Sequence, residues 1–276
     1  MLSLKLADRT ITTDLPAFIM GIVNATPDSF WSGSRGGVER AKKLIDDGAH
    51  LLDIGGESTR PDSEYIDEEE EIRRVVPVIE QIRKVSDIPI SVDTRKYAVM
   101  KAAVEAGADI LNDVSAMEDS PKLAELCAET KIPVILMHKR GIPSDMQKNT
   151  AYGNIFNEVN QYLASRVQFA LDAGVEPDKI ILDPGIGFGK DVESNFELIR
   201  RCGELCDGKY PVLMALSRKS CLGAVTGRAV EERLSATLAA DILSVLHGAF
   251  MVRVHDVAET KDTLAVYNAV QNGKIS

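Results

Sequence analysis

One stretch of the chain reads Pro211-Val212-Leu213-Met214-Ala215-Leu216-Ser217-Arg218-Lys219-Ser220, a short apolar run that ends in a cationic loop. The pattern returns roughly thirty residues later, where a second apolar run leads into Arg253-Val254-His255-Asp256, and this interval is typical of one βα unit. The chain has a formal net charge of -10, so its average field repels anions. Cations gathered beyond two strands therefore predict a local site for an anionic ligand.

Short apolar runs alternate with longer segments of helical period along the chain, which predicts strands that alternate with helices. The strands are expected at 18–23, 51–54, 88–92, 109–111, 132–137, 180–182, 212–216 and 250–254. The amphipathic stretches between them include 38–47, 68–85, 96–106 and 154–173. Strands that are buried on both faces read as continuous apolar runs, and eight βα units favour a closed barrel over an open sheet. We therefore predict an α/β fold, a (β/α)8 TIM barrel.

The domain organisation follows from the length and from the first residues. One domain is expected to span residues 1–276, because barrels of this size routinely fold as single units. Residues 1–16 are predicted to form a short N-terminal hairpin that covers one end of the barrel. Gly48, Gly107 and Gly174 each follow a helical run, where a glycine commonly ends the helix.

The composition argues against several classes of partner. No apolar stretch is long enough to cross a bilayer and the first residues lack the order of a signal peptide, so we expect a cytoplasmic protein without a membrane partner. Lys and Arg are scattered in an acidic chain, which argues against a nucleic-acid partner. The cysteines lack metal-ligand spacing and are predicted to be reduced and without chemical function; they are Cys127, Cys202, Cys206 and Cys221.

The loops that follow the predicted strands are rich in polar and charged residues. In a barrel these loops meet at the carboxyl ends of the strands, and active sites lie at that rim. The residues concerned are Asn24, 57–60, 93–95, 112–113, 138–139, Asp183, 217–219 and His255. The candidate catalytic residues are therefore expected at one rim of the barrel.

Six motifs occur in order, each at the end of a predicted strand. They are Gly21-Ile22-Val23-Asn24-Ala25-Thr26-Pro27-Asp28-Ser29-Phe30, Asp53-Ile54-Gly55-Gly56-Glu57-Ser58-Thr59-Arg60-Pro61, Ser91-Val92-Asp93-Thr94, Leu182-Asp183-Pro184-Gly185-Ile186-Gly187-Phe188-Gly189-Lys190, Ser217-Arg218-Lys219-Ser220 and Arg253-Val254-His255-Asp256. Together they closely resemble the dihydropteroate synthase family. The resemblance implies a TIM-barrel transferase of folate biosynthesis. Its substrates would be 6-hydroxymethyl-7,8-dihydropterin pyrophosphate and 4-aminobenzoate, and its products 7,8-dihydropteroate and pyrophosphate.

The resemblance also implies a dihydropterin pocket built from several strands. Asp93, Asn112 and Asp183 match the family's pterin-binding positions. The edge of a pterin alternates hydrogen-bond donors and acceptors, and acids and amides can pair with both. Phe188 and Met137 are expected to pack on the face of the ring.

By the same resemblance, the reaction is a substitution at the methylene carbon, in which pyrophosphate leaves early and a cation spreads over the dihydropterin ring. Asp93 and Asp183 are the anions expected to stabilise that cation. Lys219 is expected to donate to the ring carbonyl and a ring nitrogen. Asn24 is expected to hold the cofactor, a Mg²⁺ ion that also binds the pyrophosphate. These four are the predicted catalytic residues.

A separate set of residues is expected to bind the pyrophosphate. Arg253 and His255 are alternate residues of the last predicted strand, so their side chains point to the same side. They resemble the family's anion-binding pair, and cations aimed at the leaving group lower the barrier to its departure. Thr59 and Arg60 are expected to add further phosphate contacts.

The carboxylate of 4-aminobenzoate is expected to meet Ser217 and the N-terminus of the helix that begins near Lys219, where free N–H groups favour an anion. Residues 26–33 and 58–63 match the family's mobile loops, with Phe30 and Pro61 as apolar walls. Trp31-Ser32 stands where many members have a small residue followed by an aspartate, which puts loop closure and catalytic rate in question. Sulfonamides resemble 4-aminobenzoate and are expected to compete with it.

Two other functions stay open on the sequence alone. A methyltetrahydrofolate methyltransferase uses a similar pterin-binding barrel, but the Thr59-Arg60-Pro61 loop and Ser217-Arg218-Lys219 suit a second anionic substrate instead. A non-catalytic pterin-binding paralogue would explain the missing loop aspartate. The apolar segment 234–246 and the last helix are expected to join two chains as a homodimer.

Overall fold

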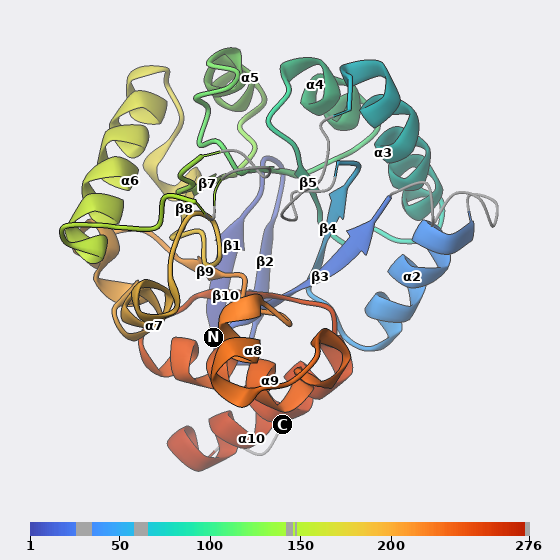
Figure 1. Ribbon diagram of the computed structural model, residues 1–276. Helices are drawn as coiled ribbons and strands as arrows, with labels where there is room; N and C mark the ends of the chain where they lie inside the picture. Colours follow the sequence, from blue (N-terminus) through green and yellow to red (C-terminus); the bar gives the residue numbers. More distant parts are fainter. Residues whose placement is uncertain (26–34, 58–65, 142–145, 147, 274–276) are drawn as a thin grey trace.

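Eight parallel strands lie at the centre of the computed structural model, and helices surround them as a ring (Figure 1). The structure describes residues 1–25, 35–57, 66–141, 146 and 148–273. The barrel strands are β3 (Phe18–Asn24), β4 (Leu51–Gly55), β5 (Ile90–Asp93), β6 (Ile110–Asp113), β7 (Val134–Met137), β8 (Ile180–Asp183), β9 (Leu213–Met214) and β10 (Met251–Val254). They pair in the order β8-β7-β6-β5-β4-β3-β10-β9, and a bridge between Leu182 and Val212 closes the ring. The predicted α/β barrel is confirmed.

The helices follow the strands as the periodicity predicted. They are α2 (Arg35–Asp46), α3 (Glu68–Arg83), α4 (Tyr97–Glu105), α5 (Lys122–Thr130), α6 (Ile155–Asp172), α7 (Val192–Arg200), α8 (Ser220–Thr226), α9 (Leu234–Leu246) and α10 (Val257–Asn272). Short 3₁₀ segments cover Pro177–Lys179, Cys202–Gly208 and Val230–Glu232. Gly48, Gly107 and Gly174 follow α2, α4 and α6 with φ of 99°, 105° and 97°, which confirms their role in ending helices.

Several strands are shorter than the apolar runs that predicted them. Pro89 and Pro133 stand just before β5 and β7, and their carbonyls accept hydrogen bonds from the adjacent strands. A proline has no N–H to donate, so the ladder begins only after each of them. β9 keeps Leu213 and Met214 of the expected 212–216. The chain then turns, and the Lys219 amide bonds to the Leu216 carbonyl at 3.1 Å.

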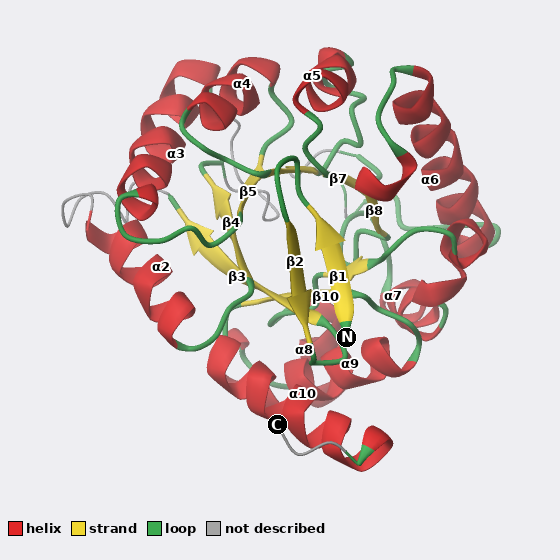
Figure 2. Ribbon diagram, turned by 180° about the vertical axis from the view of Figure 1, so that it is seen from behind, coloured by secondary structure: helices red, strands yellow, loops and turns green. Residues whose placement is uncertain are grey.

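The predicted N-terminal hairpin covers the end of the barrel where the strands begin. β1 (Leu2–Lys5) and β2 (Thr10–Thr13) pair in antiparallel fashion and lie across the barrel in Figure 2. Leu4 and Leu6 of this segment are each 3% exposed. They pack with side chains from the first halves of the barrel strands: Phe18, Met20, Leu51, Ile110, Ile135, Ile181, Leu213 and Met251. Apolar packing therefore seals this end, and the opposite end carries the polar loops.

Candidate active site

A cavity of about 720 Å³ opens at the carboxyl ends of the barrel strands. Six of the predicted site residues line it: Asn24, Phe188, Ser217, Lys219, Arg253 and His255. Apolar side chains form other parts of the wall: Ile22, Met146, Ile186 and Ala215. The cavity thus combines apolar surface with a few convergent polar groups, which is the usual composition of a small-molecule site.

Four further predicted residues lie at the ends of adjacent strands and are more deeply buried. Asp93 and Asn112 are register partners on β5 and β6, and Met137 and Asp183 are register partners on β7 and β8. Their exposed fractions are 8%, 4%, 3% and 3% in that order. Buried polar groups are costly unless they find partners, so the acids and the amide are not merely solvated loop residues.

Arg253 joins the wall of the cavity to this buried layer. Its Nη2 donates to Asp93 Oδ2 at 2.9 Å, and its Nε donates to Asp53 Oδ2 at 2.6 Å. Asn112 Nδ2 donates to the same oxygen of Asp53 at 3.2 Å. The sequence predicted Arg253 as a phosphate ligand, and in the structure its guanidinium is bonded to two acids, Asp53 and Asp93.

Asp53 is a member of the site that the sequence reasoning missed. It lies on β4, is fully buried, and keeps its Oδ1 without a hydrogen-bond partner among the described residues. The signal in the sequence is a single acid inside the apolar run 51–55. An acid in such a run points either to a helix or into the barrel, and only the fold decides between them.

The charged groups of this buried layer shift one another's pKa values. Burial raises the pKa of Asp93 to about 7; the carboxylates of Asp53, Glu71 and Asp113 add to the rise, and the Arg253 guanidinium offsets part of it. Burial alone would lower the pKa of Arg253, but Asp53 and Asp93 raise it above its ordinary value. Arg253 is therefore always charged, whereas Asp93 changes its charge near neutral pH.

Lys219 follows β9, the strand next to β10, and also lines the cavity. Its Nζ donates to the Ile186 carbonyl and lies 4.8 Å from the centroid of the Phe188 ring. Burial lowers the pKa of Lys219 to about 8, although Asp183 acts in the opposite direction. Burial raises the pKa of Asp183, and the charges of Lys219 and Arg253 offset part of that rise. Lys219, Phe188 and Asp183 are thus brought together, as the sequence predicted.

Ser217 and His255 meet at the rim. Ser217 Oγ lies 2.9 Å from His255 Nδ1, and the His255 amide donates to Ser217 Oγ at 3.2 Å. Arg218 also lines the cavity, with φ of 58° and its guanidinium in a two-point contact with Asp256 at 2.9 and 3.0 Å. The charge of Arg218, which the sequence assigned to an anionic ligand, is therefore paired with Asp256 within the protein.

Comparison with known proteins agrees with this geometry. A family model described as "Pterin binding enzyme" matches residues 20–255. The dihydropteroate synthase of Haemophilus influenzae is 42% identical over 259 residues, which cover 92% of this chain and 94% of that protein. The chain belongs to the dihydropteroate synthase family, whose members are transferases.

Two solved structures of dihydropteroate synthase from Xanthomonas albilineans extend the comparison. One, with 4-aminobenzoic acid, has a TM-score of 0.91 and 43% identity and covers 98% of both chains. The other, in complex with 7,8-dihydropteroate, has a TM-score of 0.87 and 40% identity and covers 98% of this chain and 99% of that one. The family assignment therefore rests on sequence and on the whole fold.

The remaining residues predicted from the dihydropteroate synthase motifs lie outside the described residues: Phe30, Thr59, Arg60, Pro61 and the Trp31-Ser32 departure. Glu57 and Ile66, which flank segment 58–65, meet at one charge cluster. Lys96 Nζ bonds to Glu57 Oε2 at 2.7 Å, to Glu71 Oε2 at 2.6 Å and to the Ile66 carbonyl at 2.7 Å.

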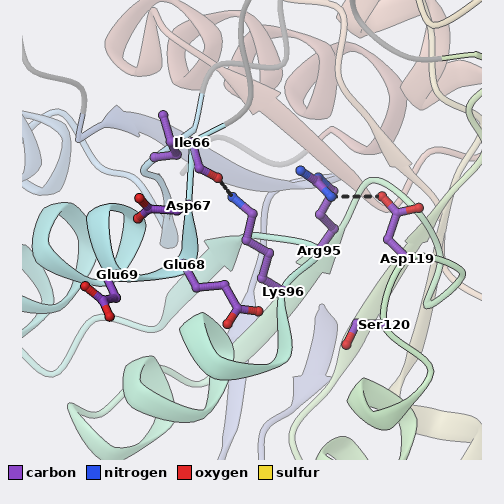
Figure 3. A pocket seen from close by; sticks show the side chains of 8 residues that line it. All are labelled: Ile66, Asp67, Glu68, Glu69, Arg95, Lys96, Asp119 and Ser120. Carbon is purple, nitrogen blue, oxygen red and sulfur yellow. Dashed lines mark hydrogen bonds and ion pairs between the residues drawn. The ribbon is translucent and has the colours of Figure 1, made fainter.

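This charge cluster adjoins a second cavity of about 690 Å³, shown in Figure 3. Arg95 bonds across it to Asp119 at 3.3 Å, and Lys96 reaches the Ile66 carbonyl. Exposed acids at the start of α3 form another side: Asp67, Glu68 and Glu69. Its lining is dominated by charged side chains, unlike the largely apolar and cationic wall of the first cavity.

Asn24, the residue predicted to hold the metal, lies in the first cavity. Asn24 is exposed at the end of β3 and lines the cavity together with Arg253 and His255. No group of three or more His, Cys, Asp or Glu side chains suited to a metal occurs among the described residues. Within the same residues, no helix has the length and apolar character needed to span a membrane. The four cysteines are buried and free.

Proposed function

We propose that this barrel joins 4-aminobenzoate to 6-hydroxymethyl-7,8-dihydropterin pyrophosphate, giving 7,8-dihydropteroate and pyrophosphate. The observation that carries the proposal is the convergence of Asp93, Asn112, Asp183 and Lys219 beside one cavity, with Arg253 bridging from the acids to the cavity wall. Family membership supports the same reaction over the methyltransferase alternative.

The dihydropterin ring is assigned to the deep part of the cavity. Asp93, Asn112 and Asp183 pair with its edge, because carboxylates accept from amino and N–H groups and an amide can both donate and accept. Lys219 donates to the ring carbonyl from its place beside Phe188, which stacks on the ring. Met137, register partner of Asp183, supplies a second packing surface.

The reaction breaks the bond between the methylene carbon and the pyrophosphate oxygen and forms a bond from that carbon to the aniline nitrogen, which then loses a proton. Positive charge develops on the ring as pyrophosphate leaves, and Asp93 and Asp183 are the nearby anions that stabilise it. The aniline nitrogen is unprotonated at neutral pH, so the site needs to position it and needs no strong base. Ser217 and the start of α8 bind its carboxylate at the rim.

Asn24 fits a Mg²⁺ ion that the protein shares with the substrate. Asn24 lines the same cavity as Arg253 and His255, and Mg²⁺ typically takes few protein ligands when phosphates and waters complete its octahedron. When bound, the ion would neutralise charge on the pyrophosphate. Arg253 and His255 bind the same group, and Thr59 and Arg60 are assigned to it by resemblance.

The test is turnover by the purified protein with Mg²⁺, dihydropterin pyrophosphate and 4-aminobenzoate. Stoichiometric release of dihydropteroate and pyrophosphate is expected, with competitive inhibition by a sulfonamide against 4-aminobenzoate. Binding of the dihydropterin without product would instead identify a non-catalytic paralogue and contradict the proposal.

The enzyme is further proposed to work as a homodimer in the cytoplasm. α9 and α10 pack side by side and leave apolar side chains exposed: Leu243 and Leu246, each 50%, Val266, 65%, and Val270, 76%. Clustered apolar surface of this kind marks an interface. Light scattering of the wild type should give the mass of two chains, and Leu246→Glu should give one.

A further inference from the structure

Lys190 is a buried cation beside the dihydropterin pocket for which the reaction above has no use. It ends the motif 182–190 and is 3% exposed. Its Nζ donates to three backbone carbonyls, those of Gly185 at 2.8 Å, Phe188 at 3.0 Å and His138 at 3.3 Å. The first two belong to the loop after β8, and the third follows β7. One ammonium group therefore ties together two loops that follow adjacent strands of the pocket.

The two loops touch backbone to backbone where Lys190 binds them. Gly185 has φ of 68°, and a Cβ at this position would lie 1.8 Å from the His138 carbonyl oxygen. Gly189 has φ of 64°, and a Cβ there would lie 2.5 Å from the Arg140 carbonyl oxygen. Only glycine fits such an approach. The position of the Phe188 ring thus depends on the close backbone contact between these two loops, the inter-loop seam, and the hydrogen bonds of Lys190 span that seam.

The charge of Lys190 is not cancelled by a direct ion pair, because its hydrogen-bond partners among the described residues are neutral carbonyls. It acts on Asp183 instead. Burial raises the pKa of Asp183, and the charges of Lys219, Arg253 and Lys190 lower it. Burial lowers the pKa of Lys190 well below its ordinary value; the charge of Asp183 raises it, and the charges of Lys219 and Arg140 lower it further.

We propose that Lys190 is a positioning residue of the dihydropterin site, which holds the Phe188 loop against the loop after β7 and supplies buried positive charge that keeps Asp183 anionic. This inference rests on the dihydropterin pocket of the proposed function. It separates two contributions of one side chain: three hydrogen bonds that fix the seam, and one charge that acts through space.

Lys179 is a matched control in the same chain. It is 6% exposed, and its Nζ donates to the carbonyls of Leu6 at 2.6 Å and Lys5 at 3.5 Å. These contacts tie the N-terminal hairpin to the closed end of the barrel. Lys179→Met therefore removes a buried, carbonyl-bound ammonium far from the cavity and reports the purely structural cost of such a loss.

The experiment compares the wild type, Lys190→Met, Lys190→Gln and Lys179→Met. Calorimetric titration with dihydropterin pyrophosphate and Mg²⁺ gives affinity across pH, steady-state kinetics give the KM of each substrate, and thermal unfolding gives stability. Lys190→Met should weaken dihydropterin binding roughly tenfold or more, since buried charge-assisted hydrogen bonds are lost. The KM for 4-aminobenzoate should change by less than about twofold.

Lys190→Gln keeps donors for the carbonyls but removes the charge. Without that charge the pKa of Asp183 rises, so the loss of affinity on acidification should begin at higher pH than in the wild type. Lys179→Met should lower stability and leave both the affinity and its pH dependence unchanged.

The proposal is overturned if Lys190→Gln shows wild-type affinity and an unmoved acid limb, or if Lys179→Met weakens dihydropterin binding as much as the Lys190 variants do. Should Lys190→Met fail to fold, Lys190→Gln alone decides by the same criteria. Failure of the wild type itself to bind the dihydropterin would overturn the proposed function, and is thereby distinguished from failure of this inference.

Discussion

The two ends of the barrel use buried charge in opposite ways. At the closed end, Arg83 is bonded to Asp109 at 2.5 Å, and Lys179 is bonded to hairpin carbonyls. Below the open end, Asp53 Oδ1 is buried without a partner among the described residues. Native proteins leave few polar groups unsatisfied, and those they leave need a reason. Arg83 and Lys179 at the closed end find partners within the chain, whereas Asp53 keeps an oxygen free to accept a hydrogen bond from a polar ligand.

The same difference appears in what surrounds the charges. The hairpin covers the closed end with Leu4 and Leu6, which are almost wholly buried. The open end gathers carboxylates around Arg253 and a lysine beside Asp183, and burial, with a smaller rise from neighbouring carboxylates, brings the pKa of Asp93 to about 7. Substitutions at the closed end should therefore cost stability, and substitutions at the open end should cost binding and turnover.

The largest effect is expected from Arg253→Met, which leaves the buried carboxylates of Asp53 and Asp93 without their cation. Breaking a buried pair costs about 3–5 kcal/mol of unfolding free energy, and kcat/KM should fall about a thousandfold. Urea unfolding and steady-state kinetics measure the two. Arg83→Met, which breaks the pair with Asp109, should lose similar stability but keep the kcat/KM of the folded protein. Wild-type turnover by Arg253→Met would refute the expected difference between an arginine at the open end and one at the closed end.

Leu6→Ala tests the closed end alone. Truncating a buried leucine leaves a cavity and should cost about 2–4 kcal/mol of unfolding free energy. Both KM values and kcat should stay close to those of the wild type at temperatures where the variant is folded. A fall in kcat under those conditions would mean that the hairpin at the closed end influences the chemistry at the open end.

The pH dependence of stability tests the charge of Asp93. Its pKa rises from an ordinary value near 4 to about 7 in the folded state, so the folded chain binds this proton more tightly than the unfolded chain. The resulting stabilisation is full below about pH 4 and is lost as the pH rises through about 7. The free energy of unfolding of the wild type relative to Asp93→Asn should fall across that window, by up to about 4 kcal/mol. Parallel curves from urea titrations would disprove it.

Ser217→Ala should give the smallest effect. The hydroxyl contacts His255 at the rim and is assigned to the carboxylate of 4-aminobenzoate. Loss of one hydrogen bond to a charged group should raise the KM for 4-aminobenzoate about tenfold and leave the KM for the dihydropterin nearly unchanged. Equal changes in the two KM values would show that the two substrates do not bind to separate parts of the open end.

The barrel could be predicted because its strands are buried on both faces. Continuous apolar runs located all eight, and the errors lie at their ends, where Pro89 and Pro133 lack an N–H and where the chain turns after β9. The residues at the carboxyl ends of the strands could be predicted for the same reason, since parallel strands bring those ends to one rim.

Contacts between distant loops could not be predicted in this way. Asp53 reads as an isolated acid within a strand until the fold places Arg253 beside it, 200 positions along the chain. Lys190 lies within the motif 182–190, yet its contact with the His138 carbonyl depends on two loops that meet only in three dimensions. The pairing of Arg218 with Asp256 likewise joins the ends of two strands. Residue type shows the available chemistry, but the partner follows from the packing.

Binding of the dihydropterin by the buried acids of the open end is tested most directly by one pair of variants. Asp93 is buried and Asp109 is half-buried; both are paired to an arginine and both have a pKa that burial raises, but they lie at opposite ends of the barrel. Calorimetric titration with dihydropterin pyrophosphate should show binding weakened about a hundredfold in Asp93→Asn and unchanged in Asp109→Asn. Equal affinities in the two variants would contradict the account.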